Sequence, residues 1–262
     1  MTTLYVLGSG SSGNALAIAC EGEVLLVDAG FSAREITLRA ERVGLDLSRV
    51  VGLALTHEHG DHTAGAARLA RTLHIPVLAA PGTWDRVRRR MPRVEFVPLV
   101  LMGAMRHGAF RVEACPTSHD AAQPVALAVM TATGYRVAIA YDLGRATMAV
   151  RLLLRQAHAI VLEANDDDVL LRTSGYPPVV QARIAGSGGH LSNRAAAELL
   201  ADVLHAGLEL VVLAHLSERC NTRDVAWAAV APVLARYGCA LHVALQHEAL
   251  PAMQLRGVGL LL

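Results

Sequence analysis

Short apolar runs recur along the chain between polar turns, a pattern typical of buried strands. These runs predict strands at residues 4–7, 15–20, 24–27, 50–55, 76–79, 110–115, 125–131, 136–141, 160–162 and 210–214, and near 241–245. Apolar residues at helical spacing predict helices at residues 33–43, 63–73, 84–91, 147–156, 193–206 and 223–237. Asn193 is the expected N-cap of the fifth helix. The mixture indicates an α/β or α+β fold in which helices cover sheets. One half is expected to end near Asp120, and a second run of strands starts at Pro124.

The first expected strand leads into a glycine-rich loop, "GSGSSGN". Gly8, Gly10 and Gly13 spell G-x-G-x-x-G, and Asp28 follows Gly8 by 20 positions, as in a dinucleotide-binding fingerprint. That motif must open a helix, and too few residues lie between Asn14 and Gly22 for a crossover helix. A hairpin therefore fits better. The small residues would let backbone N–H groups approach an anion, or they simply allow a tight turn.

Composition limits the class of protein. The chain has 262 residues, 53% of them hydrophobic, which suits a sizeable core. No apolar run reaches the roughly 18 residues of a membrane span, and the N-terminus lacks the pattern of a secretory leader. The four cysteines form no C-x-x-C pair and are interpreted as reduced thiols. We therefore expect a cytoplasmic protein without a membrane contact.

Charge is balanced overall but uneven locally. The net charge is +1, so nothing draws the whole protein towards nucleic acid. All basic residues are arginine, and a dense group occurs in "RVRRRMPR", residues 86–93. This group could hold a phosphate backbone, or it could be an ordinary solvated face.

Five expected strands each lead to a histidine or an aspartate. They end at or run into Asp28, His57, His119, Asp142 and His215. Because loops at the carboxyl ends of strands carry function, convergence of these ends would build a cluster of imidazoles and carboxylates.

The densest part of this pattern is "THEHGDH", residues 56–62, which contains H-x-H-x-D-H. A zinc protease motif would need a second histidine four residues after His57, where Asp61 stands. In an extended stretch, His57 and His59 point the same way and could hold one ion. Asp61 and His62 would then begin a helix and face a second ion, roughly 3.5–4 Å from the first. A surface turn is the weaker interpretation, because the motif follows a strand of buried type.

These residues together resemble the metallo-β-lactamase fold superfamily, over nearly the whole chain. The resemblance implies one domain, residues 1–262, built from two sheet-and-helix halves as a four-layer αββα sandwich. It implies two divalent ions at one edge of the sheets. The implied ligands of the first ion are His57, His59 and His119; those of the second are Asp61, His62 and His215. Asp142 would bridge the ions, and Asp28 would orient a ligand.

Three further stretches, "GSGSSGN", "TSHDA" and "GGHLSN" followed by "AHLS", resemble the small bacterial YycJ/WalJ-type members, for which DNA exonuclease activity is implied. The last pairing also resembles ribonuclease Z, in which a histidine ahead of the final ligand assists phosphodiester cleavage. His190 stands at that position. The same residues would also suit a helix-capping loop.

The resemblance implies a metal-dependent hydrolase, most simply a phosphodiesterase acting on nucleic acid through a metal-bridging hydroxide. Asp61 and Asp142 would hold the metals and orient the nucleophile, and His190 would contact the phosphate or protonate the leaving oxygen. Phosphate contacts are expected from the opening loop and the cap: Ser9, Ser11, Ser12, Asn14, Ser192 and Asn193. Imidazole ligands suit zinc, whereas carboxylates also suit manganese.

Several alternatives stay open. The same metals could serve hydrolysis of a small ester, thioester or lactone, and a non-catalytic metal-binding protein is a third hypothesis. β-Lactamase activity is not expected, since no cysteine occupies a ligand position. Asp166 and Cys220 depart from residues typical of the subgroup and put substrate preference in doubt. His107 is a weaker rival of His119, Glu163 has either a structural or a functional role, and a dimer is compatible with the sequence.

Overall fold

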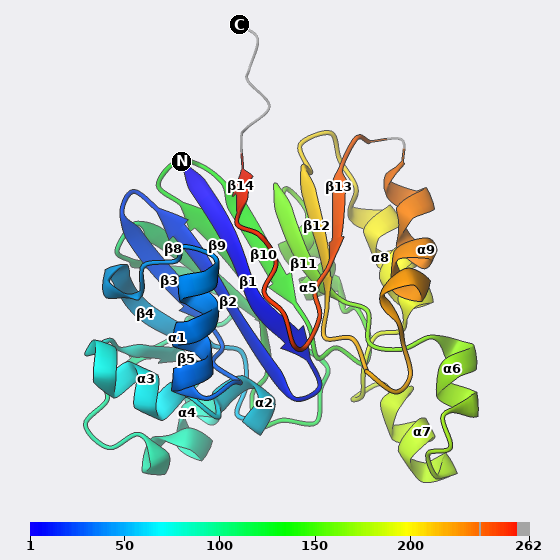
Figure 1. Ribbon diagram of the computed structural model, residues 1–262, viewed down its shortest axis with the longest axis horizontal. Helices are drawn as coiled ribbons and strands as arrows, with labels where there is room; N and C mark the ends of the chain where they lie inside the picture. The colour runs from blue at the N-terminus through cyan, green and yellow to red at the C-terminus, as the bar shows by residue number, and fades with distance from the viewer. Residues whose placement is uncertain (236, 256–262) are drawn as a thin grey trace, which may run out of the picture.

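Two seven-stranded sheets form the centre of the computed structural model, which describes residues 1–235 and 237–255 (Figure 1). The first sheet has the order β14-β1-β2-β3-β4-β5-β6. Its strands are β1 (Thr2–Gly10), β2 (Gly13–Cys20), β3 (Glu23–Val27), β4 (Val50–Leu55), β5 (Val77–Ala79), β6 (Phe96–Pro98) and β14 (Met253–Leu255). Strands β3 to β6 run parallel, whereas β14, β1, β2 and β3 pair antiparallel.

The second sheet has the order β13-β12-β11-β10-β9-β8-β7. Its strands are β7 (Gly103–His107), β8 (Phe110–Pro116), β9 (Val125–Thr131), β10 (Arg136–Ala140), β11 (Ala159–Glu163), β12 (Leu210–Ala214) and β13 (Ala240–Val243). Strands β10 to β13 run parallel and β7 to β10 antiparallel. Both sheets therefore have a parallel half whose carboxyl ends can meet at one edge.

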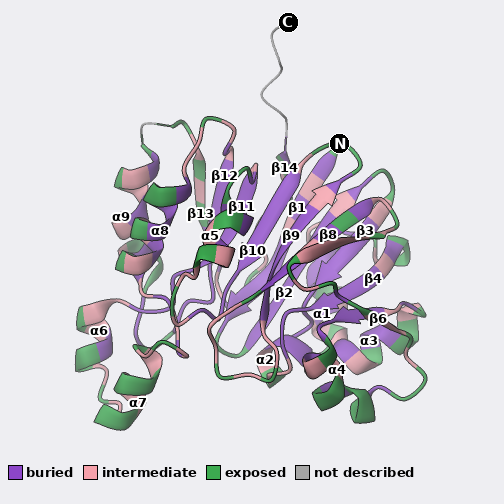
Figure 2. Cartoon of the chain, turned by 180° about the vertical axis from the view of Figure 1, so that it is seen from behind, coloured by how far each residue is buried: buried purple, intermediate pink, exposed green. Residues whose placement is uncertain are grey.

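Helices cover the outer face of each sheet, which gives four layers. The helices are α1 (Ala33–Arg42), α2 (Gly60–Thr63), α3 (Ala66–Leu73), α4 (Pro81–Val87), α5 (Met148–Leu154), α6 (Asp168–Thr173), α7 (Pro178–Ile184), α8 (Asn193–Val203) and α9 (Arg223–Leu234). One apolar cluster joins α1, α3 and α4 to the first sheet, a second lies between the sheets, and a third joins α5, α8 and α9 to the second sheet. The strands are buried while the outer helix faces are exposed (Figure 2). This is the expected αββα order.

The sequence pattern located most strands and missed the short elements. Strands β4, β9 and β12 begin and end where expected. Strands β6, β7 and β14 and helices α6 and α7 were not expected; the strands have only three to five residues, too few to show a period.

The division near Asp120 is wrong, because β7 and β8 already belong to the second sheet and β14 returns to the first. Ser192, not Asn193, caps α8. Helix α9 ends at Leu234, and the predicted end at Tyr237 runs through residue 236, which lies outside the described residues.

The glycine-rich loop is a hairpin turn. Strands β1 and β2 pair antiparallel up to Gly10 and Gly13, with Ser11 and Ser12 at the tip. No helix follows the glycines, so the dinucleotide interpretation is excluded. Among the described helices, none has the length and apolarity needed to cross a membrane.

Candidate metal centre

The strand ends converge on one edge of the two sheets. Asp28 follows β3, His57 lies just beyond β4, Asp142 follows β10 and His215 follows β12. Three of them, Asp28, Asp142 and His215, have left-handed φ angles of 57°, 55° and 55°. Such angles in non-glycine residues cost on the order of 1–3 kcal/mol and persist where surrounding contacts hold them. The backbone therefore turns abruptly at each strand end and directs these side chains into a common space.

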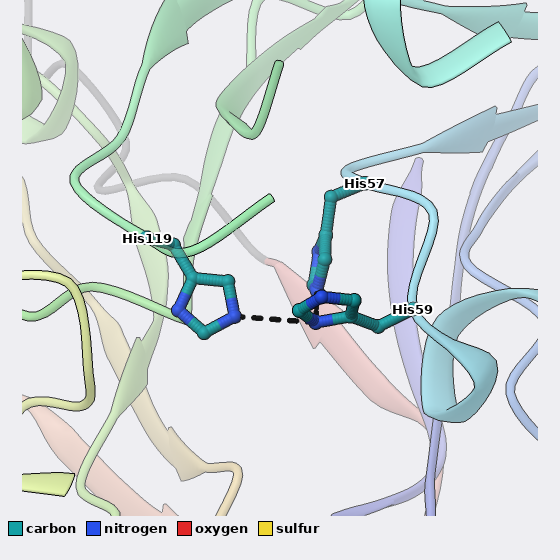
Figure 3. A group of neighbouring side chains, drawn as sticks. All are labelled: His57, His59 and His119. Atoms are coloured by element: carbon teal, nitrogen blue, oxygen red, sulfur yellow. Dashed lines mark hydrogen bonds between the residues drawn. The ribbon is translucent and has the colours of Figure 1, made fainter. Parts of the chain in front are cut away.

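Three histidines form the first group in this space (Figure 3). His59 Nδ1 lies 3.1 Å from His57 Nε2 and 3.3 Å from His119 Nε2. The other ring nitrogen of His119 lies 3.1 Å from the Gly189 carbonyl oxygen, to which it donates. Burial lowers the pKa of His57 well below its usual value, as does the neighbouring His62, so this imidazole is neutral. Three ring nitrogens with available lone pairs thus face one point.

Asp61, His62 and His215 form the second group. Asp61 Oδ2 lies 3.3 Å from His62 Nε2 and 3.3 Å from His215 Nε2. Burial raises the pKa of Asp61, but hydrogen bonds from His215 and His62 lower it more, and the net result is a pKa well below the usual value. Helix α2 begins at Gly60, so Asp61 and His62 lie in its first turn, as expected.

Asp142 lies between the two groups. Its Oδ2 atom lies 2.9 Å from His62 Nε2, and its Oδ1 atom lies 3.6 Å from both His119 Nε2 and His215 Nε2. The side chain is almost fully buried. One carboxylate therefore reaches members of both groups, which is the position expected of a bridging ligand.

Asp28 fixes the orientation of His62 from behind. Its Oδ2 atom lies 2.8 Å from His62 Nδ1 and accepts hydrogen bonds from the Tyr141 hydroxyl at 2.6 Å and the Thr56 hydroxyl at 2.8 Å. Its Oδ1 atom accepts from the Thr56 backbone N–H. Because Nδ1 is directed to Asp28, the ring presents its Nε2 atom to the centre. Thr56 and Tyr141 were not among the predicted site residues, although each directly precedes one of the expected ligands.

Glu163 holds two histidines at once. Its Oε1 atom lies 2.8 Å from His190 Nδ1 and 3.1 Å from His215 Nδ1, and its Oε2 atom accepts from the N–H groups of Leu143 and Leu191. The carboxylate is fully buried, whereas the His190 side chain is 23% exposed. Burial lowers the pKa of His190, but the Glu163 carboxylate raises this pKa by more than burial lowers it, so the net shift is upward. Burial also lowers the pKa of His215, and Asp142, Asp61 and Glu163 raise it to about 10.

Two opening-loop residues support the centre from inside the protein. Ser9 is buried; its hydroxyl donates to Asn14 Oδ1 at 2.6 Å and accepts from the His215 N–H at 2.8 Å. Asn14 is buried as well, and its Nδ2 atom lies 3.2 Å from His62 Nε2. Both side chains are fully buried in this structure, so their position does not support the predicted contact with phosphate. Ser11 and Ser12 are exposed, and the Ser12 N–H donates to Gln246 Oε1.

Of the two predicted cap residues, Ser192 and Asn193, only Ser192 is partly exposed. Ser192 is partly exposed and accepts from the Ala195 N–H. Asn193 is buried, and its side chain exchanges two hydrogen bonds with Asn221, so its position does not support the predicted phosphate contact. Cys220, one of the two departures from the subgroup, is fully buried. His107 Nε2 donates to the Val51 carbonyl oxygen at 2.9 Å, and among the described residues His107 belongs to none of the clustered groups.

Gly30 allows the backbone of the H-x-H-x-D-H segment, residues 57–62, to pack close to the glycine-rich loop, residues 8–14. A Cβ atom at this position would lie 1.7 Å from the Asp61 carbonyl oxygen and 2.6 Å from the Asn14 nitrogen. Only glycine leaves room for this backbone contact. The signal was present in the sequence as "DAG", directly after the strand that ends in Asp28.

The donor set fits divalent metal ions. A tetrahedral ion with metal–nitrogen bonds of about 2.1 Å separates its ligands by roughly 3.4 Å, close to the 3.1 and 3.3 Å between the three histidines. His62 directs one nitrogen to Asp28 and the other to Asp61 and Asp142. Buried Asp142 Oδ2 has no hydrogen bond of good geometry from the described residues. Imidazole nitrogens and carboxylate oxygens therefore converge at the centre, and this is the set of donor atoms that a divalent cation takes.

Two sheets packed between helices, with this cluster at the sheet edge, define a hydrolase of the metallo-β-lactamase fold. Residues 24–216 match the Beta-lactamase superfamily domain. The chain belongs to this superfamily.

Curated relatives resemble the chain over most of their length. Exodeoxyribonuclease YycJ of Bacillus anthracis is 32% identical over 252 residues, covering 95% of each chain. Exodeoxyribonuclease WalJ of Streptococcus pneumoniae (strain D39) is 30% identical over 226 residues, covering 84% of each chain.

Solved structures share the fold at lower identity. The metallo-β-lactamase fold protein YhfI from Bacillus subtilis has a TM-score of 0.73 at 15% identity, covering 95% of this chain and 98% of that one. The short form of human tRNase Z has a TM-score of 0.69 at 18% identity, covering 98% of this chain and 100% of that one.

Asp166 gives a pH-dependent prediction. The side chain is 2% exposed, and its Oδ1 atom has no hydrogen-bond partner among the described residues. Burial, and then the charge of Glu163, raise its pKa to about 6. The folded protein therefore retains this proton longer than the unfolded chain, whose value is near 3.8, and ionisation lowers stability progressively as pH rises from about 4 to above 6.

Asp166→Asn is expected to raise the free energy of unfolding by about 1–2 kcal/mol at roughly pH 8, and the gain should disappear near pH 4. Thermal unfolding of the metal-free protein across this range measures it. Glu41→Gln, which replaces an exposed carboxylate, should change little. An equal gain at both ends of the range would contradict the linkage to ionisation.

Proposed function

We propose that the protein is a dinuclear-metal-dependent phosphodiesterase that shortens DNA from an end. The observation that carries the proposal is the pair of three-residue groups with Asp142 between them and His190 beside Asp142. The names of the two curated relatives, both exodeoxyribonucleases, support DNA as the substrate class.

The residues that would hold the two ions follow the two groups. The first ion would take His57, His59 and His119, the second would take Asp61, His62 and His215, and Asp142 would serve both. When bound, such ions activate water near neutral pH and stabilise charge on phosphoryl oxygens. The imidazole-rich set suits zinc, and the two carboxylates suit manganese as well.

The protein's own residues position the reacting groups. Asp61 stays ionised and can accept a hydrogen bond from the attacking water, because its pKa lies well below the usual value. Glu163 and Asp28 hold the rings of His215 and His62 so that their Nε2 atoms face the centre. This rigidity keeps the attacking and leaving oxygens in line without a rearrangement at the moment of reaction.

His190 would supply the proton for the leaving oxygen. Its Nδ1–H donates to Glu163, and the raised pKa keeps Nε2 protonated as well. Proton transfer from Nε2 to the leaving oxygen produces a neutral alcohol, and Glu163 stabilises the imidazolium until that transfer. Ser11 and Ser12, exposed at the hairpin tip, are the opening-loop residues available to contact phosphate.

Metal-free protein reloaded separately with manganese and zinc tests this function. End-labelled DNA and RNA, single- and double-stranded, would be compared with a panel of small esters, thioesters and lactones. We expect cleavage of DNA only after reloading, with products shortened from one end. Bound metal without cleavage of any nucleic acid would contradict the proposal, and turnover of the small-ester panel would then identify the alternative hydrolase.

A further inference from the structure

Seven of the chain's 24 basic residues lie between residues 66 and 93, where there is only one of its 23 acidic residues. This segment thus carries a net charge of +6, against +1 for the whole chain. All seven arginines of this segment are exposed, and six of them are here called the arginine surface: Arg71, Arg86, Arg88, Arg89, Arg90 and Arg93. The overall charge is near zero because the strongly basic segment is offset by a net negative charge on the rest of the chain.

Little of this charge is neutralised within the protein. Arg88 pairs with Asp85 at 3.3 Å, but both side chains are more than half exposed, so the pair contributes little. For Arg86, Arg89, Arg90 and Arg93 the structure records no ion pair within residues 1–235 and 237–255. Like charges on successive turns destabilise a helix end, and a polyanion bound there would offset that cost.

The two helices that carry the surface both start beside the candidate metal centre. Helix α3 begins shortly after His62 and is about 12 Å long at 1.5 Å per residue. Helix α4 is held at its start by Gln123, four residues after His119: the Gly82 N–H donates to its Oε1 atom at 2.7 Å, and the Thr83 hydroxyl donates to its carbonyl oxygen at 3.0 Å.

The far ends of these helices meet. Arg71 on α3 donates to the carbonyl oxygen of Arg90, in the short 3-10 turn after α4, at 3.3 Å. Figure 1 shows α3 and α4 beside α2, which carries Asp61 and His62. At 1.5 Å per residue α3 and α4 are about 12 and 10 Å long, so the surface lies about one helix length from the helix starts beside the ligand loops. A strand that advances about 3.4 Å per nucleotide covers one such length in about three to four nucleotides.

We propose that the arginine surface binds the phosphate backbone of the DNA strand whose end lies in the metal centre. The proposal rests on the proposed function for its substrate and adds the surface that holds the strand beyond the cleaved bond. Guanidinium groups pair well with phosphate oxygens and carry no sequence preference through such contacts. This contact would favour long strands over dinucleotides.

The test compares two triple variants with the same change in charge. Arg86→Gln, Arg89→Gln and Arg90→Gln remove part of the surface. The control replaces Arg106, Arg111 and Arg155 with glutamine; all three are exposed and lie where β7 and β8 turn or just before β11 begins, at the opposite end of the second sheet. Binding of a labelled single strand of about 20 nucleotides to the metal-free proteins is followed by fluorescence anisotropy between about 50 and 200 mM salt.

We expect the surface variant to bind at least about tenfold more weakly than the wild type at low salt. The slope of log affinity against log salt should become shallower by about 2, because each lost phosphate contact contributes about 0.7. The control should match the wild type. Equal affinities and slopes for the two variants would overturn the proposal.

A second readout separates this proposal from the proposed function. In metal-loaded protein, the surface variant should lower kcat/KM for the long strand about tenfold and leave a dinucleotide unaffected. An equal loss on the dinucleotide would overturn the proposal, because the arginines would then act on the centre itself. If loaded wild type cleaves neither substrate while the binding difference persists, the proposed function fails and the binding surface stands.

Discussion

Asp142→Ala is expected to lower metal-dependent DNA cleavage by at least about 10³-fold, which corresponds to about 4 kcal/mol of lost transition-state stabilisation. Asp142 is the residue whose carboxylate reaches both groups, with Oδ2 near His62 and Oδ1 near His119 and His215. Its removal leaves five imidazoles and one carboxylate, a set with less negative charge for two divalent ions. The bound metal should therefore fall from two ions per chain towards one or none.

Metal content by elemental analysis and cleavage of end-labelled DNA measure the two consequences separately. Asp202→Asn is the matched control, because this carboxylate lies on α8 and pairs with Arg151 at the surface. Asp142→Asn keeps the shape of the side chain and separates loss of charge from loss of packing. Retention of both ions together with more than a tenth of the activity in Asp142→Ala would contradict the bridging role.

His190→Ala is expected to lower kcat for DNA by about 10²–10⁴-fold while the metal content stays unchanged. The ring centroid lies 5.4 Å from that of His119 and 5.2 Å from that of His215. His190 gathers with Asp142, Glu163 and His215 and lies outside the two groups proposed to hold the ions. A residue in this position can reach substrate without being needed to bind a metal. The role as proton donor predicts a loss that depends on the leaving group.

A nucleotide ester with a p-nitrophenolate leaving group tests that dependence, since this anion departs without a proton. We expect His190→Ala to lower its hydrolysis less than about tenfold, far less than for DNA. His242→Ala, which changes an exposed histidine on β13, serves as the control. Equal losses on both substrates would show that His190 contacts the phosphate instead of protonating the leaving oxygen, and loss of metal would make it a ligand.

The candidate ligands could be read from the chain because each occupies a local pattern. An apolar run that stops at histidine or aspartate marks both the strand and its end. Strands β10 and β12 are buried throughout, and β4 is buried at every position except Val51. The H-x-H-x-D-H segment likewise depends on extended geometry followed by one helical turn, which neighbouring residues specify. Short strands such as β6 and β14 offered no period and were missed.

By itself, then, the sequence determined the layered α/β architecture, the strand ends and the residue types that meet at them. The tertiary structure decided which atoms support the site. Ser9 reaches His215 across 206 residues, Tyr141 reaches Asp28 across 113, and Glu163 at the end of β11 reaches both His190 and His215. These partners follow from strand order and register, which no local pattern specifies. For the same reason, only the fold placed Ser9, Asn14 and Asn193 in the interior and brought Arg71 of α3 into contact with Arg90 of the turn after α4.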